Sequence, residues 1–208
     1  RRFRVIALAI VLLVILDQSV KVWVKLSIQP GDEILLLGEL FKLHFIENKG
    51  AAFGLTLASL FGSLDEHSAK ILLSVFSIVL CMGLAWYLRR MVKYKSRLPI
   101  YIALILAGAL GNIIDRVYYG VWFAYENDYE GGLFEGRVVD MFYLDLWAGT
   151  VPEGIPLLGG QLLALWPIFN LADVYISLGI LLILFGNRHL FSAEGKTADR
   201  TRACEEKA

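Results

Sequence analysis

The sequence has few of the residues that build disulfide frameworks, metal centres and the commonest hydrolase sites. Its two cysteines, Cys81 and Cys204, lie in an apolar run and a polar tail, so they form no disulfide framework. The three histidines are scattered along the chain, which argues against a histidine-based metal site. The motifs GxSxG and HExxH and an intramembrane Ser/Lys pair are also missing. The formal net charge is zero, which gives no support for nucleic-acid binding.

The chain is instead rich in long apolar stretches. Hydrophobic residues make up 57% of it and its mean hydropathy is +0.61, whereas a soluble domain is about 45–50% apolar. The stretches long enough to cross a bilayer cover residues 5–26, 69–88, 98–116 and 167–185. The sequence therefore predicts an all-α membrane protein with four transmembrane helices, a small extracytoplasmic β-element and outer-face loops.

The first apolar stretch resembles a secretory signal peptide, because arginines precede it. No small-residue cleavage site follows, so we interpret it as a retained helix. Asp17 and Lys21 lie inside it at the four-residue spacing at which opposite charges pair on one helix face. We interpret them as a structural polar pair rather than as catalytic residues.

The uneven distribution of lysine and arginine predicts how the chain is oriented in the membrane. The connection at residues 89–97 is strongly basic, whereas residues 27–67 and 118–166 are mainly acidic. By the positive-inside rule, both termini and residues 89–97 face the cytoplasm, and the two acidic regions face outward. We expect a single domain over residues 1–191 and a disordered cytoplasmic tail over residues 192–208.

The third apolar stretch ends in a group of polar residues. Small residues and one carboxylate share a helical face in it at four-residue spacing, which lets another membrane helix approach closely. They are Ala103, Ala107, Gly111 and Asp115. Asn112 and Arg116 flank the carboxylate within one turn. Polar groups are costly to place near lipid, so this turn is a candidate functional site.

Asp115, Asp140 and Asp173 are the acidic residues expected at the outer end of the bundle. Asn170 and Ser177 share a helical face with Asp173 by their spacing. Two carboxylates held together near an apolar boundary share a proton. The ionised one can take a proton from water while the protonated one hydrogen-bonds a scissile carbonyl. This aspartic protease chemistry requires neither metal nor cofactor.

Two other interpretations fit the same residues. A proton-coupled transporter that uses these carboxylates fits almost as well, although four spans without an internal repeat make a poor alternating-access machine. A non-enzymatic scaffold whose acidic loops bind a partner is the third interpretation.

Five blocks along the chain occur together in a known order. They are DQSVK at 17–21, ENKGAAFG at 47–54, GNIIDR at 111–116, VVDMF at 138–142 and FNLAD at 169–173. In these blocks, and over roughly residues 4–186, the chain resembles the lipoprotein signal peptidase family, also called signal peptidase II. The resemblance implies a monomeric, multi-pass aspartic endopeptidase of the bacterial inner membrane, active at the outer (periplasmic) face. Its partners would be the lipid bilayer and a diacylglyceryl-modified prolipoprotein, cut just before the modified cysteine, with no nucleic acid, metal or cofactor.

The resemblance also assigns roles to residues. Asp140 and Asp173 match the catalytic pair. The positions that match substrate-binding or site-shaping residues are Asn48, Gly54, Asn112, Asp115, Arg116 and Asn170.

The regions outside the membrane carry two further features. Residues 41–45 alternate between apolar and polar, which predicts a short half-buried strand. The segments 118–135 and 143–166 are longer than in compact family members. Residues 118–135 form either a lid over the site, together with residues 41–53, or a passive insertion.

Overall fold

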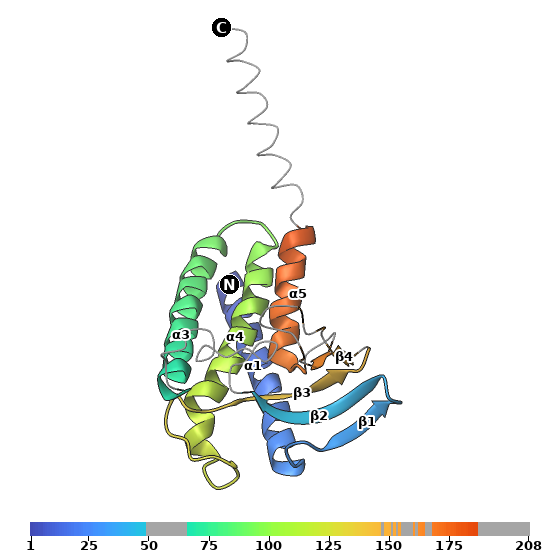
Figure 1. Cartoon of the computed structure of the whole chain (residues 1–208). Helices are drawn as coiled ribbons and strands as arrows, with labels where there is room; N and C mark the ends of the chain where they lie inside the picture. The colour runs from blue at the N-terminus through green and yellow to red at the C-terminus, as the bar shows by residue number, and fades with distance from the viewer. Residues whose placement is uncertain are drawn as a thin grey trace.

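The computed structural model describes residues 1–48, 66–146, 148–150, 152, 154, 160, 162–164 and 168–186. Its helices are α1 (Arg2–Ser27), α3 (Glu66–Met91), α4 (Leu98–Trp122) and α5 (Leu171–Gly186). Its strands are β1 (Glu33–Leu37), β2 (Phe41–Asn48), β3 (Val138–Leu144), β4 (Ala148–Thr150) and β5 (Leu162–Ala164). The helices form a bundle, and a small sheet crosses one end of it (Figure 1). Gly54 and the tail at 192–208 lie outside the described residues.

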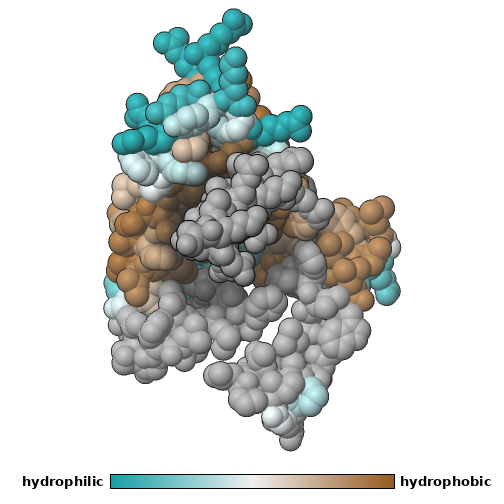
Figure 2. Space-filling view, turned by 90° about the horizontal axis from the view of Figure 1, so that it is seen from above, coloured by the Kyte–Doolittle hydropathy of each residue, from teal (hydrophilic) through white to brown (hydrophobic). Residues whose placement is uncertain are grey.

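Among the described residues, three helices are long and apolar enough to cross a membrane: α1, residues 67–91 of α3, and α4. Seen from above, the molecule shows a region of apolar side chains along one flank, coloured brown in Figure 2. Helix α5 is also apolar, and its described part has 16 residues, a length of about 24 Å against a hydrocarbon core of about 30 Å. The long apolar helices agree with the predicted multi-pass architecture, and the described part of the fourth helix is shorter than a full span.

Helix α4 lies at the centre of the bundle and packs against α1, α3 and α5. The predicted small-residue face is confirmed, since Ala103, Ala107, Gly111 and Asp115 are all buried. A methyl group added to Gly111 would reach the carboxylate of Asp17 on α1. The close approach of these helices therefore depends on residues without bulky side chains.

Two helix ends differ from the prediction. Helix α4 continues to Trp122, so Asp115 lies inside it rather than at its end. Helix α5 begins at Leu171, because Phe169 is held in a β-bridge to Phe142. Asn170 therefore precedes the helix instead of lying on its face, and Asp173 lies in the first turn rather than one to two turns in.

The main sheet has the order β1-β2-β3, with both pairs antiparallel. The strand predicted at residues 41–45 is confirmed as part of β2. Strand β3 carries Asp140, which lies opposite Ile46 of β2. Strands β4 and β5 form a separate two-stranded sheet within the segment 143–166. The β-element thus brings a candidate catalytic residue to the end of the helical bundle.

Gly136 lets the chain enter β3 directly against helix α4. Its N–H donates to the carbonyl of Arg116 over 3.0 Å, and an added methyl group would overlap the carbonyl oxygen of Asp115. Gly136→Ala should therefore lower stability by about 1–3 kcal/mol, because neither backbone can give way cheaply. Gly83→Ala in α3, with nothing within 4 Å of the added group, should raise it by about 1 kcal/mol. Equal thermal unfolding midpoints for the two variants would contradict this packing.

Candidate active site

A buried cluster of charges joins α1 to α4 at the base of the site. Lys21 Nζ lies 3.0 Å from the carboxylate of Asp17 and 2.8 Å from that of Asp115, and all three side chains are fully buried. The contact predicted between Asp17 and Lys21 is present, and Asp115 is its third member. One cation thus serves two carboxylates, which keeps charges away from lipid.

Gln18 and Tyr119 complete this cluster and were not singled out from the sequence. Gln18 Nε2 donates to Asp115 Oδ1 over 2.8 Å, and Tyr119 Oη donates to Gln18 Oε1 over 3.1 Å. Two sequence signals pointed to them: Gln18 stands next to Asp17, and Tyr119 follows Asp115 by four residues on the same helix face.

Asn112 connects the charge cluster to Asp173. Lys21 Nζ donates to Asn112 Oδ1 over 2.9 Å, and Asn112 Nδ2 donates to Asp173 Oδ1 over 3.0 Å. A lysine ammonium has only donors, so it holds the amide oxygen toward itself and turns the amide NH₂ toward Asp173. The buried lysine thereby orients a donor onto a candidate catalytic carboxylate.

Asp173 lies in a capping box at the start of α5. Its N–H donates to Asn170 Oδ1 over 3.0 Å, and the N–H of Asn170 donates to Asp173 Oδ2 over 3.1 Å. Such reciprocal bonds satisfy backbone donors that a helix start leaves open. They also place the carboxylate at the positive end of the helix dipole.

Asp140 is 2% exposed and shares Asn170 with Asp173 as a hydrogen-bond partner. Asn170 Nδ2 donates to Asp140 Oδ1 over 2.6 Å, and the backbone N–H of Asn170 donates to Asp173 Oδ2, so Asn170 contacts both carboxylates. Asn48 Nδ2 donates to the other oxygen of Asp140 over 3.0 Å. Burial, and next the charge of Asp173, raises the pKa of Asp140 from its ordinary 3.8 to about 7, although hydrogen bonds from the two asparagines act against the rise.

The charge cluster also holds the backbones that carry the two carboxylates. The N–H of Val139, next to Asp140, donates to Asp115 Oδ2 over 3.3 Å. The N–H of Ala172, next to Asp173, donates to Asp17 Oδ1 over 3.0 Å. Buried charges thus fix β3 and α5 relative to each other.

Arg116 is placed differently from the other predicted site residues. Its Nη1 donates to the hydroxyl of Ser77 on α3 over 3.2 Å. Ser177, expected on the same face as Asp173, is exposed. Within the described parts of the chain, no group of three or more His, Cys, Asp or Glu side chains is placed to hold a metal ion.

The fold and this site define a multi-pass membrane protein with buried carboxylates where its helices meet its sheet. The chain belongs to the signal peptidase II family, whose profile matches residues 9–187. It is 38% identical over 196 residues to a lipoprotein signal peptidase of Porphyromonas gingivalis, covering 87% of this chain and 81% of the relative. It is 36% identical over 184 residues to one of Amoebophilus asiaticus, covering 85% and 75%. The chain is thus a membrane hydrolase of the protease class that acts in lipoprotein processing.

Solved structures share the architecture. A bacterial membrane enzyme determined at 2.3 Å resolution superposes with a TM-score of 0.60 at 25% identity, covering 88% of this chain and 86% of that one. A second bacterial membrane enzyme, at 22% identity, has the same TM-score and covers 89% and 93%. The fold described above is therefore shared with experimentally determined membrane enzymes.

Proposed function

We propose that this protein is an aspartic endopeptidase that cuts the signal peptide from prolipoproteins just before the diacylglyceryl-modified cysteine. The observation that carries the proposal is the placement of Asp140 and Asp173 around Asn170, which donates a hydrogen bond to each carboxylate. The relatives that share this chain's family are lipoprotein signal peptidases. In cells, loss of the protein should accumulate precursor that is lipidated but uncut. Normal processing in its absence, with no second enzyme of the family present, would refute the proposal.

The two carboxylates have different environments, which assigns them different roles. Asp140 is the one that holds the shared proton, because burial and the neighbouring charge disfavour its ionisation. Asp173 acts as the base, because hydrogen bonds from Asn112 and from the backbone of Asn170 hold its carboxylate in place at the start of α5. Carboxylates with divergent affinities for a proton supply the acid and the base of one reaction.

The reaction follows from these two roles. Asp173 takes a proton from a water molecule as the water oxygen bonds to the scissile carbonyl carbon, and Asp140 gives its proton to the carbonyl oxygen. The resulting gem-diol then collapses. Asp173 returns its proton to the leaving nitrogen, one diol hydroxyl gives its proton to Asp140, and the C–N bond breaks. Both carboxyl groups end as they began, so the cycle needs no cofactor.

The depth of the site supports a lipidated substrate. Asp17 accepts a hydrogen bond from the N–H of Ala172 at the start of α5. Along the axis of α1, Asp17 lies about 22 Å from Arg2, the first residue of the helix. With a hydrocarbon core of about 30 Å, the carboxylates lie just inside the boundary at the sheet end. We place that end at the outer face of a bacterial inner membrane and both termini in the cytoplasm. Acyl chains on the substrate cysteine can then stay in the bilayer while the adjacent peptide bond reaches the site.

The rate should fall as the pH rises through about 7. The pKa of Asp140 is raised, so the residue keeps its proton below that pH and loses it above. Above pH 7 the scissile carbonyl therefore loses its proton donor. We expect kcat/KM, which reports on the free enzyme, to fall about tenfold per unit once the pH exceeds the pKa. A kcat/KM that is flat or rising between pH 7 and 9 would contradict the assignment of the proton to Asp140.

A further inference from the structure

A chain of ion pairs links the segment after α4 to the end of strand β2. Lys25 of α1 pairs with Glu47, Arg137 Nη1 lies 3.7 Å from Glu47 Oε2, and the same nitrogen lies 3.0 Å from Asp128. Glu47 and Arg137 are largely buried, with side-chain exposures of 7% and 13%. This chain of charges is separate from the Lys21 cluster and plays no part in the reaction described above.

Tyr129 holds Arg137 in a second way. The guanidinium lies 3.8 Å from the centre of the Tyr129 ring, and the N–H of Arg137 donates to the Tyr129 hydroxyl over 3.2 Å. Burial and the charge of Glu47 raise the pKa of Tyr129 to about 12, so the hydroxyl remains neutral. Stacking of a planar guanidinium on an aromatic face is a geometry that lysine does not reproduce.

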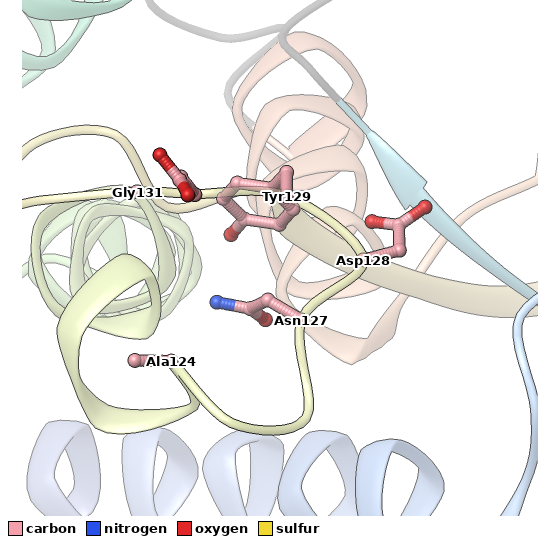
Figure 3. Close-up of a pocket in the computed structure, with 6 residues that line it drawn as sticks. Ala124, Asn127, Asp128, Tyr129 and Gly131 are labelled. Atoms are coloured by element: carbon pink, nitrogen blue, oxygen red, sulfur yellow. The ribbon is translucent and has the colours of Figure 1, made fainter.

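The segment that carries Tyr129 is itself fixed to α4. The N–H of Phe134 donates to the carbonyl of Val117 over 3.0 Å, and Asn127 Nδ2 donates to that of Tyr119 over 3.1 Å. Figure 3 shows the segment leaving α4 and running past the end of a strand, with Asp128 on the strand side and Asn127 on the helix side. A shallow pocket of about 470 Å³ lies against it, lined by Ala124, Asn127, Asp128, Tyr129, Glu130 and Gly131. The segment is thus a firm support from which Arg137 can act.

The contact between Arg137 and Glu47 lies next to a contact of the active site. Glu47 immediately precedes Asn48, whose amide donates to Asp140 over 3.0 Å. Glu47 Oε2 and Arg137 Nε are buried, and in the described part of the chain neither makes a hydrogen bond. A buried ion pair with unsatisfied groups contributes little net stability, and its better-attested role is to fix one arrangement of the chain.

We propose that Arg137 is a positioning residue that clamps the end of β2, so that Asn48 stays on Asp140. The clamp rests on the proposed function, because it acts on the same carboxylate. Arg137 touches no reacting atom. Residues 123–135 hold Arg137 in place, and Arg137 in turn holds Glu47 and the adjacent Asn48. The segment is then neither a passive insertion nor a free lid, but the anchor of one wall of the site.

The test is a double-mutant cycle between Arg137→Gln and Asn48→Ala, measured as kcat on a diacylglyceryl-modified precursor in nanodiscs. Arg137→Gln should lower kcat about tenfold, the effect of one misplaced hydrogen bond, with KM changed less than twofold. In the Asn48→Ala background the same substitution should change kcat less than twofold, because the group it positions is already gone. The matched control is Lys42→Gln, on the same strand as Glu47. It removes the ion pair in which Lys42 Nζ lies 3.0 Å from Asp145 Oδ2, and it should leave kcat within twofold.

Two results would overturn the clamp: an effect of Arg137→Gln no larger than that of Lys42→Gln, or effects of Arg137→Gln and Asn48→Ala that simply multiply. If Arg137→Gln does not fold, Tyr129→Leu removes the stacking partner and keeps the ion pairs. It should lower kcat several-fold with the same dependence on Asn48, and an unchanged kcat would count against the clamp. An inactive wild-type enzyme would refute the proposed function itself, whereas a multiplicative cycle in an active enzyme would refute only the clamp.

Discussion

Asp173→Asn is expected to lower kcat on a lipidated precursor by about 10⁴-fold, at the upper end of what acid–base catalysis contributes, with KM changed only a few-fold. Asparagine keeps the shape of the side chain and can still be held at the start of α5, but it cannot take a proton from water. Asp140→Asn should cost a similar factor, because the scissile carbonyl loses its proton donor. Single-turnover cleavage measures the effect on catalysis, and a separate measurement of precursor binding measures the effect on affinity.

The two losses should not multiply, since each residue is useless to the reaction without the other. The double variant is expected to be about as slow as either single one. Asp145→Asn is the matched control: it removes a carboxylate that follows the same strand as Asp140 and pairs with Lys42. It should leave kcat within twofold. More than a tenth of the turnover retained in Asp173→Asn would refute the catalytic pair.

Lys21→Met is expected to lower the free energy of unfolding by about 3–5 kcal/mol, the usual cost of removing one partner from a buried ion pair. Methionine fills similar space, but it leaves Asp17 and Asp115 buried beside each other without the cation that now lies 3.0 and 2.8 Å from them. Thermal unfolding in detergent or nanodiscs measures the loss.

A second-site substitution checks the cause of this loss. Asp115→Asn in the Lys21→Met background should recover part of the stability, because one uncompensated charge is removed. A Lys21→Met variant with unchanged stability and abolished cleavage would instead make Lys21 a participant in the reaction. That result would contradict its assignment as a structural residue.

Spacing along the chain predicted the contacts that lie within one helix. Asp17 and Lys21 are four residues apart and do touch, and the small-residue face ending at Asp115 is buried as expected. Such contacts follow from helix geometry alone. The contact of Lys21 with Asp115 joins two helices far apart in the sequence, and no local pattern specifies it.

Two features of the site do not follow from the sequence pattern, for different reasons. The start of α5 was misplaced, although Asn170 and Asp173 have the spacing of a capping box. The apolar run upstream of Asn170 extended the predicted helix to Pro167, which lies outside the described residues. Strand β3 was not predicted because Val138, Val139 and Met141 are all buried along with Asp140, so the strand lacks the alternation that marks a half-buried one.

Mass spectrometry of the cleavage products is the sharpest test of the proposed activity. The purified protein in nanodiscs is given a precursor with or without diacylglycerol on its cysteine. We expect a single cut in the lipidated precursor, with the modified cysteine as the new N-terminus, at a rate that a metal chelator does not change. We expect no cut in the unmodified precursor and no product from Asp140→Asn or Asp173→Asn. Equal cleavage of both precursors, a rate abolished by the chelator, or normal cleavage by either aspartate variant would contradict the proposed activity.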